Sequence, residues 1–210
     1  LPVHSLGTVQ VPHPPGWLPA EILQVDPAAV KEFRNVPVYL IAGPLIPADA
    51  PVYTPDPAQD GLKFTYFSLA ALELARRLQF PPDILHVNDW HTAPAAYALW
   101  LHRKQDRFYS NSKIVLGLHN LPYLGLGAGP ALDEFGLPPA KNSTLPEWAQ
   151  HPPLPLALLA ADRIVAVSPS YAREITSPEF GAGLQDFLDS RKDHITGILN
   201  GLDTVRWDPA

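Results

Sequence analysis

Short apolar runs alternate with longer amphipathic segments along most of the chain. Runs with the length and composition of buried strands lie at 83–88, 113–118, 163–167 and 195–199. Segments whose apolar residues recur at helical spacing lie at 64–79, 92–104, 154–161, 169–175 and 183–190. Strands that alternate with helices form right-handed βαβ units around a parallel sheet. The pattern therefore predicts an α/β fold, a Rossmann-like parallel sheet with helices on both faces.

The remaining segments carry weaker patterns. Residues 1–35 are rich in proline, which interrupts long periodicities, and they predict loops with short strands at most. The apolar run 36–41 predicts one further buried strand, and a polar, proline-rich loop is expected at 45–61. The stretch 121–152 exceeds an ordinary connection, which indicates a functional loop or short helices.

Composition narrows the class of protein. A chain of 210 residues with 46% hydrophobic content suits one α/β domain, so we expect a single domain spanning 1–210. Its 15 Lys and Arg are scattered and its net charge is −6, which argues against nucleic acid or an acidic membrane as a partner. A neutral polar ligand fits better. No apolar segment approaches the roughly 18 residues of a membrane helix and no signal-peptide pattern opens the chain, so we expect a soluble cytoplasmic protein.

The chain contains neither cysteine nor methionine. The lack of cysteine excludes disulfides, thiolate metal ligands and cysteine nucleophiles. The lack of methionine leads us to expect a fragment of a longer reading frame.

Polar side chains follow each of the four predicted parallel strands at the point where the strand ends. Residues 86–91 read His-Val-Asn-Asp-Trp-His, and the next two strands end in His119-Asn120 and Ser168-Pro169-Ser170. The last strand ends in Asn200-Gly201. Open α/β sheets bind ligands outside the carboxyl ends of their strands, so this edge is the candidate site.

Residues 86–91 allow more than one interpretation. His86, Asp89 and His91 suit a metal ion, as in a metal-dependent hydrolase. Side chains alternate along an extended segment, however, so the two histidines would face opposite ways. Alternatively, His86 lies in the core and His91 caps the following helix. A carboxylate such as Asp89 at a strand end either caps that helix or meets a ligand hydroxyl.

Other motifs have simpler explanations. The glycines of 125–129 lack the spacing of a dinucleotide-binding loop, and Pro130 follows where a helix should begin. Ser168 before Pro169 is typical of a helix N-cap. Asn200-Gly201 is typical of a turn with positive φ. His119 and Asn120, in contrast, combine donors and acceptors of the kind that sugar recognition requires.

Several segments resemble the motifs of one family, the bacterial glycogen synthases and plant starch synthases, which are retaining glycosyltransferases with the two-domain GT-B fold. The matching stretches are 64–73, 86–93, 118–125, 161–175, 177–181, 197–203 and 207–210. They include Asp-Trp-His at 89–91 and Ile-Leu-Asn-Gly at 198–201. Their order and spacing are similar to the N-terminal half of that fold, the acceptor-side domain, from Val36 onward.

The resemblance implies transfer of glucose from ADP-glucose, or less often UDP-glucose, to the 4-hydroxyl of an α-1,4-glucan, without a metal ion or other cofactor. It implies that His119 approaches the donor glucose as the catalytic residue, with Asn120 beside it. Asp89 is expected near the reacting sugars and Asn200 along the cleft. Tyr123 is expected to contact the acceptor.

The chain also departs from the family pattern. Residues 1–35 contain no counterpart of the Lys-x-Gly-Gly loop, so we expect the first strand and loop of the domain to be missing. The loop at 50–63 is shorter than usual, and 151–157 lacks a Lys-Gly-Gly run. The chain ends where the nucleotide-binding domain, with its diphosphate-binding residues, would begin. We therefore expect the isolated chain to be inactive; a stand-alone α-glucan-binding module is the alternative.

Overall fold

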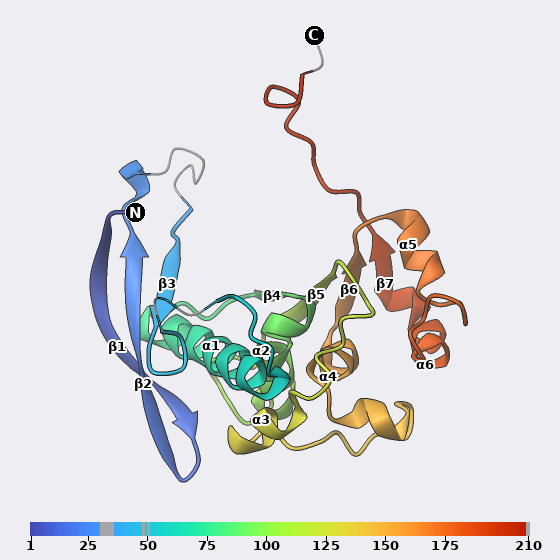
Figure 1. The fold of residues 1–210 in the computed structure, drawn as a ribbon, viewed down its shortest axis with the longest axis horizontal. Helices are drawn as coiled ribbons and strands as arrows, with labels where there is room; N and C mark the ends of the chain where they lie inside the picture. The colour runs from blue at the N-terminus through green and yellow to red at the C-terminus, as the bar shows by residue number, and fades with distance from the viewer. Residues whose placement is uncertain (30–35, 48, 50, 209–210) are drawn as a thin grey trace.

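A computed structural model describes residues 1–29, 36–47, 49 and 51–208. Its central feature is a parallel sheet with strand order β4-β5-β6-β7 (Figure 1). The strands are β4 (Ile84–Asn88), β5 (Lys113–Leu118), β6 (Arg163–Ala166) and β7 (Ile195–Gly197). These are the four strands that the apolar runs predict. They confirm the α/β class and the parallel sheet flanked by helices.

The helices also follow the predicted order. They are α1 (Pro57–Arg77), α2 (Asp89–His102), α3 (Gly129–Glu134), α4 (Pro153–Ala160), α5 (Pro169–Glu174) and α6 (Gln185–Ser190), with short 3-10 turns η1 (Pro27–Ala29), η3 (Glu147–Gln150) and η4 (Lys192–His194). Helix α1 begins seven residues earlier than predicted, because the Asp56 side chain accepts from the amide of Ala58 and Pro57 occupies the first turn. In the stretch 121–152, α3 and η3 confirm the expectation of short helices.

The prediction for the N-terminal region is wrong. Strands β1 (Val3–His13) and β2 (Gly16–Val25) form a long antiparallel hairpin instead of loops. Its inward positions, such as Val11 and Ile22, are fully buried. The prolines do not break the hairpin because of where they fall: Pro14 and Pro15 form its turn, and Pro19 lies outside the part of β2 that pairs with a third strand. Residues 30–35 of this prediction lie outside the described residues.

The strand predicted at 36–41 belongs to a different sheet. It is observed as β3 (Tyr39–Ala42), which pairs antiparallel with β2. The order β1-β2-β3 defines a separate sheet, and in β3 Leu40 is exposed while the other side chains are partly buried. A strand is therefore present as predicted, but the prediction that it is buried was wrong.

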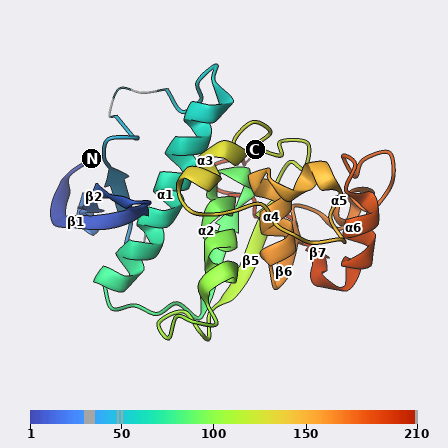
Figure 2. The same cartoon turned by 90° about the horizontal axis from the view of Figure 1, so that it is seen from below.

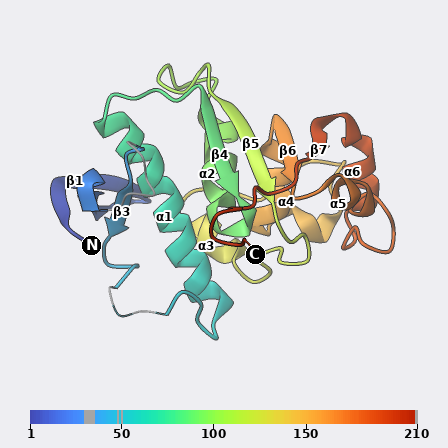
Figure 3. The same ribbon diagram turned by 90° about the horizontal axis from the view of Figure 1, so that it is seen from above.

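Helix α1 joins the two sheets. It packs against β1 on one side and against α2 on the other, and Figures 2 and 3 show it between the antiparallel and the parallel sheet. The buried Tyr66 donates from its hydroxyl to the carbonyl of Pro19 at 2.6 Å, which fixes the hairpin to the helix. Within the described residues, no helix combines the length and hydropathy needed to cross a membrane.

Candidate functional site

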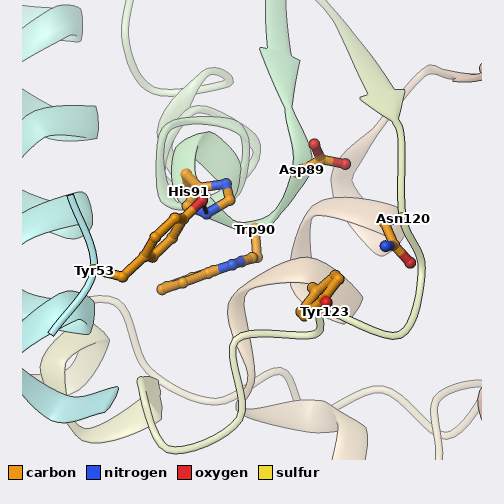
Figure 4. Close-up of a pocket in the computed structure, with 6 residues that line it drawn as sticks. All are labelled: Tyr53, Asp89, Trp90, His91, Asn120 and Tyr123. Carbon is orange, nitrogen blue, oxygen red and sulfur yellow. Dashed lines mark hydrogen bonds between the residues drawn. The ribbon is translucent and has the colours of Figure 1, made fainter. Parts of the chain in front are cut away.

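A cavity of about 530 Å³ opens at the carboxyl edge of the parallel sheet. Its lining comes from three places: the loop before α1, the first turn of α2, and the loop after β5 (Figure 4). The lining residues are Tyr53, Asp89, Trp90, His91, Asn120 and Tyr123. The sequence predicts a site at this edge, and three of the candidate residues, Asp89, Asn120 and Tyr123, line the cavity.

Asp89 connects the ends of two neighbouring strands. One carboxylate oxygen accepts from the amide of His119 at 2.8 Å, and the other lies 2.9 Å from His119 Nδ1. The backbone of Asp89 has a φ of 52°, a left-handed conformation that is uncommon outside glycine and that often marks functional positions. The carboxylate therefore binds His119 and does not cap α2, so the first alternative from the sequence is wrong; contact with a ligand hydroxyl stays a prediction.

The first turn of α2 is closed by another residue. The Thr92 hydroxyl accepts from the amide of Asn88 at 2.6 Å and donates to its carbonyl at 2.8 Å. Because Thr92 forms these hydrogen bonds, the side chain of Asp89 is available to bind His119. The helix accordingly starts at Asp89, three residues before the predicted start.

His119 is held by this pairing in one orientation. Because Nδ1 lies beside the carboxylate, the imidazole carries a proton on that nitrogen. The other ring nitrogen, Nε2, points away from Asp89. The side chain is about half exposed, at 47%. His119 can therefore present Nε2 to a ligand while Asp89 fixes its tautomer.

An aromatic cluster forms the other wall of the cavity. Tyr53 and His91 share a hydrogen bond of 3.0 Å between Oη and Nε2. The ring of Trp90 lies 4.5 Å from that of His91, and Phe64 meets both rings edge-on. Burial lowers the pKa of His91. His91 thus contributes to the cavity wall, and the expectation that it caps α2 was wrong.

The glycine-rich segment 125–129 supports this wall from behind. A Cβ on Gly125 would lie 2.9 Å from Trp90 and 2.9 Å from Pro153, and Gly125 also has a φ of 74°. Helix α3 does begin at Gly129, because Pro130 is tolerated in a first turn. Gly125 therefore permits both the left-handed turn and the close approach of the Trp90 ring.

A second, smaller cavity of about 120 Å³ lies beside His119. His119 and Asn200 line it, together with His86 and Asn88. A Cβ on Gly117, which also lines this cavity, would collide with the Asn88 side chain. His119 therefore faces a different cavity from Asn120, its neighbour in the chain.

The residues after β6 and β7 follow the sequence predictions in one case and depart from them in the other. Ser168 is the N-cap of α5, since its hydroxyl accepts from the amide of Tyr171 at 2.9 Å, as predicted. Asn200 and Gly201 have no positive φ and lie in an extended segment after β7, so the predicted turn was wrong. Strand β7 ends at Gly197, and Asn200, three residues later in that segment, lines the smaller cavity.

The candidate metal ligands are not brought together. His86 lines the smaller cavity, whereas Asp89 and His91 line the larger one. Across the part of the chain that the structure describes, no group of three or more His, Asp or Glu side chains has an arrangement that could hold a metal ion. A metal-dependent hydrolase is not favoured by this arrangement.

Lys and Arg side chains are absent from the described lining of both cavities. The one charged carboxylate at the centre is Asp89, which is paired with His119. Aromatic rings beside neutral donors and acceptors suit an uncharged, hydroxyl-rich ligand better than a phosphate.

The wall formed by Tyr53 and Trp90 was not predicted from the sequence. Tyr53 lies in a proline-rich loop without periodicity, and it meets His91 38 positions further along the chain. Trp90 was visible in the Asp-Trp-His segment as a large aromatic residue at a strand end. That position was the available signal for Trp90, whereas the sequence carried none for Tyr53.

Comparison with known proteins identifies a family that matches most of the chain. Residues 3–190 match a family model described as the starch synthase catalytic domain. This match begins upstream of Val36, so it extends further toward the N-terminus than the resemblance predicted from the sequence motifs.

Curated relatives are similar over most of the chain. Glycogen synthase 2 of Geobacter sulfurreducens is 39% identical over 183 residues, covering 84% of this chain and 37% of the relative. Glycogen synthase of Streptococcus mutans is 40% identical over 159 residues, covering 71% of this chain and 32% of the relative. The chain therefore spans about a third of the length of these relatives.

A solved structure shares the fold. The catalytic domain of starch synthase IV from Arabidopsis thaliana, bound to ADP and acarbose, matches with a TM-score of 0.79 and 26% sequence identity. The match covers 99% of this chain and 42% of the other. This likeness agrees with the predicted N-terminal half of a GT-B fold.

Proposed function

Because the chain belongs to the glycogen and starch synthase family, we propose that it is the acceptor-side domain of a glycosyltransferase acting on α-glucan. In the proposed reaction, glucose passes from ADP-glucose to the non-reducing 4-hydroxyl of an α-1,4-glucan with retention of configuration. The observation that carries the proposal is the Asp89–His119 pair, in which Asp89 lines the aromatic-walled cavity and His119 lines the smaller one beside Asn200.

The larger cavity suits the acceptor glucan. Sugar rings present apolar faces that pack on aromatic side chains and hydroxyls that exchange hydrogen bonds with neutral polar groups. Trp90 and Tyr123 supply the aromatic faces, and Asn120 supplies an amide. Tyr123 is 64% exposed, so its ring is accessible to a bound chain.

The smaller cavity suits the reacting end of the donor. We assign His119 the catalytic role of binding the donor glucose through Nε2, while Asp89 keeps the proton on Nδ1. Asn200, on the segment after β7, is assigned a contact in the cleft. Support for ADP as the donor nucleotide comes from the Arabidopsis protein, whose structure contains ADP and acarbose.

A departing diphosphate must be stabilised by cations or strong donors. Neither cavity has a Lys or Arg in its described lining. We therefore propose that these groups lie outside the 210 residues and that the chain alone does not transfer glucose. Measurable incorporation of glucose from ADP-glucose into glycogen by the purified chain would show that this is wrong.

The first experiment is a ligand-observed NMR titration of the chain with maltoheptaose, repeated on Asp89→Ala and His119→Ala. We expect saturation transfer to the glucan in the original chain, its loss in Asp89→Ala, whose side chain lines the larger cavity, and its retention in His119→Ala, because His119 lines the smaller cavity. Exposed Asp186→Ala on α6, away from the cavity lining, is the matched control and should leave the signal unchanged. The absence of any glucan signal in the original chain would contradict the proposal.

A stand-alone glucan-binding module is the second candidate, because residues of this chain alone line the larger cavity. The two proposals differ in their response to ADP-glucose. Saturation transfer to ADP-glucose that disappears in His119→Ala supports the transferase domain. Binding of maltoheptaose without any response to ADP-glucose supports the module.

A further inference from the structure

The loop 51–54 forms a wall shared by neighbouring cavities. Tyr53 lines the aromatic cavity of about 530 Å³, whereas Pro51 and Val52 line an adjoining cavity of about 380 Å³. Thr54 lines a third cavity of about 270 Å³, which also contains Trp90. The position of this loop therefore determines the shape of the surface offered to a glucan.

Two charged side chains of α1 lie beneath this loop. Asp60 is 5% exposed, and the side chain of Lys63 is 11% exposed. They form an ion pair of 2.9 Å within one helical turn. Charges so deeply buried are retained in proteins only when their remaining donors and acceptors are satisfied.

The partners that satisfy this pair belong to the loop. Both carboxylate oxygens of Asp60 accept from the amide of Thr54 at 3.1 Å. Lys63 Nζ donates to the carbonyls of Val52 at 2.5 Å and Pro51 at 3.3 Å. The backbone is thus held on both sides of Tyr53, while the Tyr53 side chain reaches away from the loop to His91.

A buried ion pair contributes little net stability, because desolvation offsets the attraction between the charges. Its value lies in directed hydrogen bonds, which specify one arrangement of the groups that it contacts. We propose that Asp60 and Lys63 are positioning residues that hold Tyr53 against His91 and so fix the wall of the glucan cavity. The glucan part of this inference rests on the proposed function.

The test replaces the pair together, Asp60→Leu with Lys63→Met, so that no buried charge is left without its partner. The matched control is Asp189→Leu with Lys192→Met, which removes an exposed ion pair of the same sequence spacing. Two quantities are measured: the nuclear Overhauser effect between the rings of Tyr53 and His91 without ligand, and the Kd for maltoheptaose. Asp60→Asn with Lys63→Gln is the milder variant should the first double substitution prevent folding, and Lys63→Arg tests rescue by a conserved charge.

We expect the nuclear Overhauser effect between Tyr53 and His91 to disappear when Asp60→Leu and Lys63→Met are combined, which we call the α1 variant. The effect should persist in the control and in Lys63→Arg. The Kd should rise about tenfold in the α1 variant, the scale of a lost charge-assisted hydrogen bond. If the pair acts through Tyr53, the same substitutions should change the Kd less than about twofold in a Tyr53→Ala background.

An unchanged Tyr53–His91 effect in the α1 variant overturns the inference, as does an equal rise of the Kd with Tyr53 present and absent. The ring measurement needs no ligand, so it tests the positioning role even if the original chain fails to bind maltoheptaose. That failure would contradict the proposed function instead.

Discussion

At the scale of single residues, the candidate site contains one carboxylate that connects the ends of two strands. Asp89 lies at the start of α2 and reaches His119 after β5 with both of its oxygens. Its left-handed backbone turns the side chain out of the direction that the strand and helix would give it. The geometry of His119 is therefore set by a residue 30 positions earlier.

Asp89→Asn should change the tautomer of His119 with little effect on stability. The amide oxygen can still accept from the backbone of His119, but the amide nitrogen would face the Nδ1 proton as a second donor. We expect the proton to move to Nε2, with a change in unfolding free energy of about 1 kcal/mol. Nitrogen-15 NMR of the imidazole reads the tautomer directly. An imidazole that keeps its proton on Nδ1 would contradict the role given to Asp89.

The buried His91 should lower the free energy of unfolding as the pH falls. Burial lowers the pKa of His91 below its ordinary value of 6.5, although Asp89 and Asp60 oppose the shift. The unfolded chain then binds a proton that the folded chain does not, so stability is lost as the pH falls through 6.5 and the loss levels off below the folded pKa. Chemical denaturation between about pH 7 and about pH 5 should show a steeper loss for the original chain than for His91→Gln. Parallel curves would show that the folded pKa of His91 is not lowered.

At the scale of elements, close backbone approach places the segment that carries Asn200. Strand β7 packs against α5, and a Cβ on Gly197 would collide with the backbone of Ser168 and Pro169 at the start of that helix. Backbone atoms cannot move aside as a flexible side chain can. Gly197 is therefore required where β7 meets α5.

Gly197→Ala should destabilise the chain by about 1–3 kcal/mol, the usual range for overpacking. Gly201, four residues later, has no atom within 4 Å of an added Cβ and provides the matched control. Gly201→Ala should alter the unfolding free energy by no more than about 0.5 kcal/mol. Urea denaturation measures both variants, and equal shifts would mean that β7 does not pack as closely as described.

At the scale of the whole molecule, charge and ligand chemistry agree. The chain has a net charge of −6, and the described lining of the two cavities holds no Lys or Arg. Screening by salt affects charged ligands strongly and neutral ligands little. The proposed glucan acceptor is neutral, so its binding should not depend on long-range electrostatics.

The Kd for maltoheptaose should therefore change less than about twofold between about 0.05 M and about 0.5 M NaCl. Isothermal titration at the two salt concentrations tests this expectation. Maltoheptaose carrying a terminal phosphate is the matched ligand, and its Kd should respond to salt. A strong salt dependence for the neutral glucan would indicate that charged groups govern its binding.

Much of the fold could be predicted because its signals are local. The runs ending in Asn88, Leu118, Ala166 and Gly197 are apolar and short, and the alternation with helices implies parallel pairing. The hairpin of β1 and β2 was not predicted, because whether a proline such as Pro19 disrupts a strand depends on which part of the strand is paired.

The sequence by itself determined the parallel sheet, the edge that carries the candidate site, and three of the residues that line the larger cavity: Asp89, Asn120 and Tyr123. Strand periodicity and polar strand ends encode these features within a few residues of each other. Only the tertiary structure placed Tyr53 on His91, set His119 toward a second cavity, and put Asp60 and Lys63 beneath the loop 51–54. The first two arrangements join segments far apart in the chain, and all depend on packing directions, which no local pattern of side chains specifies.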